Sequence, residues 1–154
     1  MADSLQIPDF LPERYFDQPL TAYGVFVDRF GTIRRQFEVE IQGTAKDNGF
    51  ILDEVFIYDN GARETRKWVI VKRSDGHYEG RCDDVIGHAT GHHQDNLLRW
   101  QYRFRLAMYG RKVSVYFDDV MVLHQGGVVV NRATISKWGV KLGEVLLSFR
   151  PSEQ

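Results

Sequence analysis

The chain has 154 residues, of which 43% are hydrophobic and 27% are charged, and its formal net charge is −1. This length and composition predict one soluble, globular domain with a hydrophobic core. A nearly neutral charge without a basic stripe gives no support for nucleic-acid binding. A single cysteine, Cys82, excludes an intramolecular disulfide and a zinc site of the multi-cysteine type.

The sequence contains no membrane-targeting pattern. No apolar run reaches the ~20 residues that a membrane-spanning helix needs. The N-terminus has no basic region followed by an apolar one, so no secretory signal is predicted. The sequence as printed therefore predicts a cytoplasmic protein.

The first 19 residues differ in composition from the rest of the chain. They hold three of the four prolines and show no strand pattern. Proline is tolerated in a first helical turn, so Pro12 predicts a short helix from residue 12 to residue 16. The segment 1–19 is expected to pack on the mouth of a barrel domain formed by residues 20–150.

Most of the remaining chain alternates apolar and polar residues with a period of two, which is typical of strands with one buried face. Before residue 96 the predicted strands are 20–29, 34–44, 49–58, 64–73, 77–83 and 84–92. Glycine-bearing pairs such as Asn60-Gly61 and Asp75-Gly76 separate several of them, as expected for hairpins. With four more strands after residue 96, the pattern favours an up-and-down antiparallel barrel.

The region from residue 96 to residue 150 has the clearest pattern. Its joints are Tyr109-Gly110, Gln125-Gly126 and Gly139-Val140. If each pair forms the centre of a two-residue hairpin, the facing residues are fixed. The predicted rows are Trp100–Asp119–Arg132–Leu147, Leu98–Met121–Val130–Phe149 and Tyr102–Phe117–Thr134–Val145.

Asp119 and Arg132 are the two charges in this predicted apolar face. Burial of either charge alone would be costly, so an inward pair must be salt-bridged or bound to a polar ligand group. The pair is therefore a polar anchor or acid/base centre in a pocket, or else a structural ion pair that fixes strand register.

Two further patterns concern the barrel interior. The joint Asp95-Asn96 places Gly91, Ala89 and Gly87 opposite the large aromatics Trp100, Tyr102 and Phe104, as in a filled or ligand-sized barrel. A second inward pair is predicted between Glu54 and Lys67, and a structural or surface role is the alternative for it.

The histidines and Cys82 do not form a recognisable site. The parity that places Ala89 and Gly91 inside places His88 and His92 outside, and no zinc-ligand spacing accompanies them. No serine-nucleophile motif or phosphate-binding loop is present. Cys82 has no activating neighbour in the sequence and is interpreted as an ordinary strand residue.

A set of short motifs along the chain is specific when taken together. In chain order the motifs are Leu20-Thr21-Ala22-Tyr23-Gly24, Asp28-Arg29-Phe30-Gly31, Arg34-Arg35-Gln36-Phe37, Leu52-Asp53-Glu54, Tyr58-Asp59-Asn60-Gly61, Asp83-Asp84-Val85-Ile86-Gly87, Arg99-Trp100-Gln101-Tyr102, Phe117-Asp118-Asp119-Val120-Met121, Asn131-Arg132-Ala133, Ser136-Lys137-Trp138-Gly139 and Gly143-Glu144-Val145. From Phe16 to Arg150 the chain resembles a bacterial family, the domain-of-unknown-function family 3833.

The resemblance implies a lipocalin-type barrel without a settled activity. Members are often described as lipoproteins and are often associated with genes for modifying fatty acids. This chain lacks the usual lipoprotein signal and acylated cysteine, and it has Cys82 where relatives tend to have a small residue. The resemblance leaves the cell envelope open as a location if the chain is a trimmed form.

The sequence thus predicts an all-β fold: a single antiparallel up-and-down β-barrel of eight to ten strands, calycin- or lipocalin-like, with a short N-terminal helical segment. The first functional hypothesis is a pocket for a hydrophobic small molecule, a fatty acid or lipid-like compound. Its predicted ligand-binding residues are Glu54, Trp100, Tyr102, Phe104, Phe117, Asp119, Met121 and Arg132.

Two alternatives remain at this point. One is a cofactor-free barrel enzyme, such as a cyclase, isomerase or hydratase of a lipid-like substrate, with Asp119 as acid/base and Arg132 as its electrostatic partner. The other is an interaction module with a filled core. No metal, cofactor or nucleic-acid partner is expected, and the sequence does not specify an oligomeric state.

Overall fold

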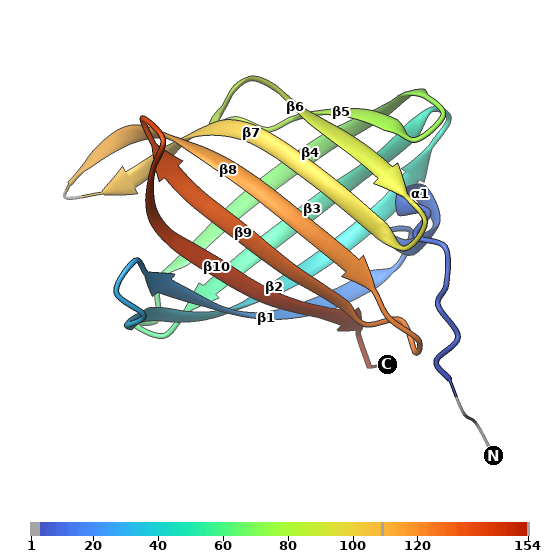
Figure 1. Ribbon diagram of the computed structural model, residues 1–154, viewed down its shortest axis with the longest axis horizontal. Coiled ribbons are helices and arrows are strands. Elements are labelled where there is room, and N and C mark those ends of the chain that lie inside the picture. The colour runs from blue at the N-terminus through green and yellow to red at the C-terminus, as the bar shows by residue number, and fades with distance from the viewer. Residues whose placement is uncertain (1–3, 109, 154) are drawn as a thin grey trace.

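The protein forms one closed, antiparallel β-barrel in which each strand pairs with its neighbours in sequence and β1 pairs with β10 (Figure 1). The computed structural model describes residues 4–108 and 110–153. Its elements are α1 (Pro12–Tyr15), β1 (Pro19–Asp28), β2 (Ile33–Lys46), β3 (Gly49–Tyr58), β4 (Arg63–Ser74), β5 (His77–Arg81), β6 (Val85–Gln94), β7 (Leu97–Met108), β8 (Arg111–Leu123), β9 (Val129–Lys137) and β10 (Val140–Pro151). The predicted all-β class, the ten strands and the short helix are confirmed.

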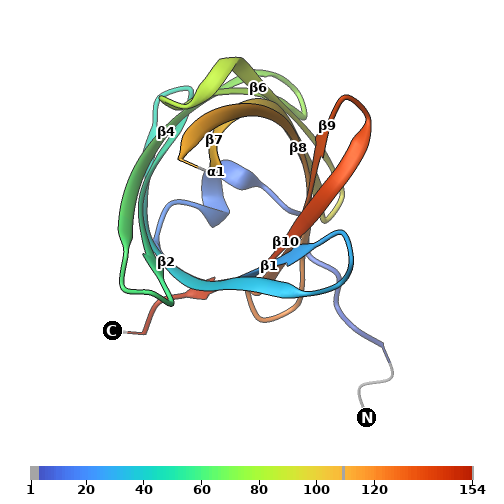
Figure 2. The ribbon, with the colours of Figure 1, turned by 90° about the vertical axis from the view of Figure 1, so that its left-hand side faces the viewer.

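The N-terminal segment closes one end of the barrel. Phe10, Tyr15 and Phe16 are buried, and Phe16 stacks on Phe50 of β3 at a ring-centre distance of 5.5 Å. The Tyr15 hydroxyl donates a hydrogen bond to the Gly127 carbonyl oxygen at 2.7 Å. A view along the barrel shows α1 across its far end (Figure 2). The hairpins at the opposite end therefore surround the open mouth.

Within the described residues, no helix has the length and apolar character that a membrane span requires.

Side chains of alternating size fill the end of the barrel near α1. Gly80 and Gly91 lie against the Trp100 indole, where an added Cβ would come within 2.5 and 2.4 Å of ring atoms. Gly91 pairs with Trp100, as predicted. The predicted pairing of Gly87 with Phe104 is wrong, because a bulge in β6 pairs Val85 with Phe104 instead.

The strand register departs from the prediction at β9. Trp100 pairs with Asp119 as predicted, but Asp119 pairs with Ala133 rather than Arg132. The observed row is Trp100–Asp119–Ala133–Val145. Arg132 therefore points outward, and the predicted Asp119–Arg132 pair is wrong.

The length of the hairpin loop explains this difference. The His124 amide donates to the Val128 carbonyl and the Gly127 amide donates to the His124 carbonyl, so the loop has three residues rather than two. In three-residue hairpins the last loop residue adopts a left-handed conformation, which suits Gly127 at φ 83°. This loop places Val129, Asn131, Ala133 and Ile135 inside and leaves Arg132 in solvent, so the charge is not buried.

The same effect changes the predicted partner of Glu54. Tyr58 and Ala62 close a three-residue loop between β3 and β4. Glu54 consequently pairs with Arg66, while Lys67 pairs with Asp53 and is exposed. The predicted Glu54–Lys67 pair is wrong, although Glu54 faces inward beside Ile41 as expected.

Candidate functional site

A cavity of about 820 Å3 lies inside the barrel and extends from α1 to the open mouth. Its floor and walls are mostly aromatic and aliphatic, and its mouth is rich in cations. The wall residues include Phe16, Phe50, Leu98, Trp68, Trp100, Tyr102, Phe104, Phe117, Met121 and Ile135. The cations at the mouth are Arg34, Arg35, Arg63, Arg105 and Lys112. This size and composition are typical of a small-molecule pocket.

Asp119 is the most deeply buried charged residue of this wall. Its side chain is 5% exposed, and Oδ1 has no hydrogen-bond partner among the described residues. Burial raises the pKa of Asp119 to about 8, although the Asn131 side chain lowers it in part. Asn131 is 1% exposed, and its own Oδ1 also has no described partner. The carboxyl group is therefore largely protonated at neutral pH and has unused hydrogen-bonding capacity.

Glu54 is a second carboxyl group inside the barrel. Burial raises its pKa to about 7, while the Arg66 charge and a polar contact with the Trp68 indole lower it in part. Glu54 is also close enough to Asp119 for its charge to raise the pKa of Asp119. The cavity therefore contains two carboxyl groups that exchange protons near neutral pH.

Tyr102 lies in the same electrostatic environment. Burial raises its pKa well above the usual value, and Asp119 and Glu54 raise it further while Arg66 lowers it. Its ring stacks on Phe117 at 5.1 Å and meets Trp68 edge-on at 5.3 Å. These contacts hold a neutral phenol in the cavity wall, where its hydroxyl is a hydrogen-bonding group for a neutral or anionic partner.

Besides the cations at the mouth, the cavity wall contains the half-buried Arg66, which sequence reasoning missed. Its guanidinium donates two hydrogen bonds to Glu64 Oε1, from Nη2 at 2.7 Å and from Nε at 3.0 Å. It also lies over the rings of Phe56 and Phe104, at 4.6 and 4.7 Å from their centres. Burial opposes the charge, but the contact with Glu64 more than offsets it, so the pKa of Arg66 is raised. Arg66 is therefore a fixed positive charge in the lumen.

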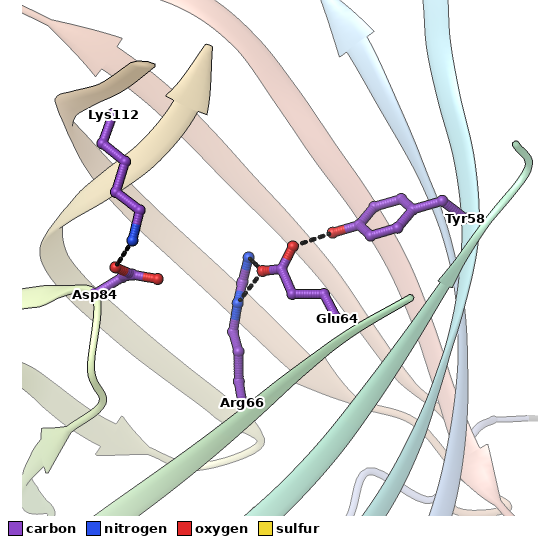
Figure 3. A network of polar contacts seen from close by, with 5 residues as sticks. All are labelled: Tyr58, Glu64, Arg66, Asp84 and Lys112. Carbon is purple, nitrogen blue, oxygen red and sulfur yellow. Dashed lines mark hydrogen bonds and ion pairs between the residues drawn. The ribbon is translucent and has the colours of Figure 1, made fainter. Parts of the chain in front are cut away.

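Polar side chains line the path from this charge to the mouth (Figure 3). Glu64 lies between Arg66 and Tyr58, and the Tyr58 hydroxyl donates to Glu64 Oε2 at 3.3 Å. A separate pair forms where Lys112 Nζ donates to Asp84 Oδ1 at 2.8 Å. All five residues, Tyr58, Glu64, Arg66, Asp84 and Lys112, line the cavity. The cavity is thus polar near its mouth, and apolar side chains line its floor by α1.

The predicted site residues separate into two groups. The cavity lining includes Glu54, Trp100, Tyr102, Phe104, Phe117, Asp119 and Met121. Arg132 is not among them: its side chain is 64% exposed and its Nε lies 3.6 Å from Glu144 Oε2 on the outer surface. The structure thus excludes a direct role for Arg132 in the cavity, and the roles of the others stay predictions.

Four of the five histidines are exposed, and His93 is half-buried. His88 and His92 are exposed, as predicted from their parity with Ala89. The His92 and His77 rings lie next to each other, tilted by 39° with their centres 4.7 Å apart. Over the described ranges 4–108 and 110–153, no group of three or more metal-ligating side chains is present. No candidate metal site is therefore identified within those ranges.

The sequence contained an indication of the residues that were missed, which are Arg66, Trp68 and Asn131. Shifting the β3–β4 and β8–β9 pairings by one residue brings Arg66 opposite Glu54 and Asn131 opposite Met121. The glycine doublet Gly126-Gly127 was the indication that a longer loop was available.

A comparison with protein-family models identifies the family of the chain. The model described as "Protein of unknown function (DUF3833)" matches residues 3–151. The chain belongs to this family. The search of curated proteins found no match. The family assignment names no ligand or activity, so the cavity has to be interpreted from its own chemistry.

Proposed function

We propose that this DUF3833 protein binds one hydrophobic small molecule, a fatty acid or similar lipid-like compound, inside its barrel. The observation that carries the proposal is the cavity of about 820 Å3, lined by aromatic and aliphatic side chains, with the buried Asp119 in its wall, whose Oδ1 has no hydrogen-bond partner among the described residues. A core that served only for stability would be expected to be close-packed. A buried carboxyl without a partner is costly unless water or a ligand group reaches it.

The cavity chemistry favours a particular kind of polar end on the ligand. Protonated Asp119 and Glu54 both donate and accept hydrogen bonds, and Tyr102 adds a third hydroxyl. A hydroxyl, a carbonyl or a protonated carboxylic acid fits these groups. An ionised head group would instead be drawn toward Arg66 and the basic mouth, with its chain along the aromatic wall.

Tryptophan fluorescence tests the proposal with the protein as it exists. Trp68 and Trp100 line the cavity, whereas Trp138 is 91% exposed, so Trp138→Phe removes the surface signal. Titration of this variant with hexadecanoic acid and with hexadecanol should change the remaining emission saturably. Mass spectrometry of small molecules extracted from the purified protein is the second measurement.

A matched pair of substitutions controls this experiment. Ala133→Phe fills the cavity, because Ala133 faces Asp119. Arg132→Phe places the same side chain on the outer surface one residue away. Only the first should abolish ligand binding. Equal binding by both variants, or no saturable response in the parent, would contradict the proposal.

A second candidate function is cofactor-free catalysis on a similar substrate, such as isomerisation or hydration. The observation that favours it is the pair Asp119 and Glu54, with pKa values raised to about 8 and about 7 in one cavity. A protonated carboxyl can donate a proton while a neighbouring carboxylate accepts one. Incubation with an unsaturated fatty acid should then give an isomer or hydrate, and Asp119→Asn should lose turnover while retaining binding.

A further inference from the structure

Large hydrophobic side chains project from two hairpins at the open end of the barrel. Phe30 and Ile33 belong to the β1–β2 hairpin and are 79% and 56% exposed. Trp138 and Val140 belong to the β9–β10 hairpin and are 91% and 52% exposed. The two hairpins lie at the same end of the molecule, opposite α1 (Figure 1). Such exposure of Phe and Trp at protruding tips is unfavourable in water unless a partner covers them.

Both tips are held in defined positions. Asp28 Oδ1 accepts hydrogen bonds from the backbone amides of Phe30 and Thr32, at 2.9 and 3.0 Å. The Arg29 amide donates to the Leu142 carbonyl at 3.1 Å, which connects the two hairpins. Trp138 and Gly139 form a two-residue turn in which both have positive φ. The aromatic side chains therefore extend from preformed tips.

Cations accompany these aromatics. Arg29 lies over the Phe30 ring at 4.9 Å, and Lys137 Nζ lies over the Trp138 ring at 4.5 Å. Arg63 and Arg105 add further exposed charges at the mouth. Neither of these two guanidinium groups, nor that of Arg29, forms an ion pair with a carboxylate in the described part of the chain. The mouth is thus basic although the whole chain has a net charge of −1.

The opposite end has the complementary charge. Its turns and the segment beside α1 carry the acidic residues Asp9, Glu13, Asp17, Asp47, Asp75 and Asp95, which outnumber the cations Arg14, Lys46, Lys72 and Arg73 at the same end. This separation of charge gives the molecule an electric dipole whose positive end is at the cavity mouth. An anionic surface would attract the mouth and repel the closed end.

We propose that the open rim, defined here as Arg29, Phe30, Ile33, Lys137, Trp138 and Val140, docks on an anionic phospholipid bilayer with the cavity mouth facing the lipid. Trp and Phe at the tips enter the interfacial region, and the adjacent cations contact lipid phosphates. A hydrophobic ligand could then pass between bilayer and barrel without crossing water. The docking itself does not require that the cavity be occupied.

The arrangement of the rim favours a bilayer over a folded protein partner. The exposed apolar side chains lie at the protruding tips of two hairpins that are neighbours in the barrel, on one side of the cavity mouth. A protein interface has to match such a surface with a continuous, well-packed core. A fluid lipid interface adapts to the two protruding hairpin tips. Its anionic head groups are complementary in charge to Arg29 and Lys137 beside the tips.

Vesicle binding tests this proposal. The probes are large vesicles of equimolar phosphatidylglycerol and phosphatidylcholine, and vesicles of phosphatidylcholine alone. The full chain should cosediment with the first and weakly with the second, and added salt should reduce binding. Because Trp68 and Trp100 are buried, the emission of exposed Trp138 should shift to the blue on binding.

Two double variants separate the rim from general surface hydrophobicity. Phe30→Ser with Trp138→Ser should weaken vesicle binding by about tenfold or more. The matched control, Leu5→Ser with Ile7→Ser, removes side chains that are 66% and 60% exposed in the N-terminal segment, and it should leave binding unchanged. Circular dichroism checks that both variants fold.

Three results would overturn the proposal: absence of binding to anionic vesicles, equal loss in the two double variants, or an unchanged Trp138 emission. Failure of fatty-acid binding in the cavity would leave vesicle binding intact, so the two proposals are distinguished. Cosedimentation lost only in the control variant would assign the contact to the N-terminal segment and would also reject the rim.

Discussion

The substitution Asp119→Asn tests whether this carboxyl is held protonated in the cavity. The unfolded chain has the ordinary aspartate pKa of 3.8, whereas the folded pKa is raised to about 8. Between these values the unfolded state has lost the proton and the folded state retains it. Raising the pH across this window therefore lowers the free energy of unfolding of the wild-type protein. Asparagine has no titratable proton, so the unfolding free energy of the variant lacks this pH-dependent contribution.

The expected size follows from the linkage relation. Each pH unit inside the window corresponds to about 1.4 kcal/mol per group. Between about pH 5 and about pH 7 the variant should therefore gain about 2.5 kcal/mol in unfolding free energy relative to wild type. Urea unfolding of both proteins at these two pH values measures the difference. Glu54 titrates in both proteins, so its effect on the difference largely cancels.

The neighbouring substitution Asp118→Asn is the control. Asp118 is on the outer face and is paired with Arg99 at 2.7 Å, so its loss should cost at most about 1 kcal/mol. The Asp118 charge contributes to the raised pKa of Asp119, but less than burial does, so the cost of Asp118→Asn should change with pH far less than the effect of Asp119→Asn. If the stability advantage of Asp119→Asn does not grow with pH, or if the control shows the same trend, the conclusion that Asp119 is protonated in the cavity is wrong.

Two further predictions concern packing and closure. Gly91→Ala should destabilise the barrel by about 1–3 kcal/mol in urea unfolding, because its Cβ would meet Trp100 at 2.4 Å; Thr90→Ala on the outer face should have little effect. Tyr78→Phe should cost about 1–2 kcal/mol in the same assay, because the Tyr78 hydroxyl donates to Glu13 Oε1 at 2.7 Å and connects α1 to β5. An unchanged stability in either case would contradict the corresponding contact.

Local periodicity was sufficient to predict the barrel. The alternation of apolar residues and the glycine-bearing joints specify strands and antiparallel neighbours, because both are local properties of the chain. β10 was even predicted with the correct residues inside. The one-residue errors at the β8–β9 and β9–β10 joints added up to a shift of two residues, so the row of Asp119 ends at Val145 rather than at Leu147. A shift of two residues keeps the same face inside, so Val145, Leu147 and Phe149 face inward in both the prediction and the structure.

The candidate site was harder to predict because it depends on parity and on space. Strand β9 contains apolar residues on both faces, so its pattern alone did not decide which face is inside. The loop length decided it, and the glycine doublet allowed two lengths. The cavity volume could not be read from the sequence, because it depends on how aromatic side chains pack across a closed barrel. Arg66 was missed because the loop between β3 and β4 was also predicted with two residues instead of three.

Adjacent substitutions on β9 test this parity directly. Arg132→Ala should change the unfolding free energy by at most about 1 kcal/mol, since Arg132 is a 64% exposed partner of Glu144. Ala133→Arg places a guanidinium in the cavity opposite Asp119. The guanidinium lowers the pKa of Asp119 from about 8, but the two groups form an ion pair only once the carboxyl has lost its proton, so the substitution should be most costly at acidic pH. Near pH 9 the carboxyl is ionised and the two charges can pair, so the cost should fall. If Arg132→Ala is the more damaging change at both pH values, β9 has the opposite face inside, and the cavity wall described by Asn131 and Ala133 is wrong.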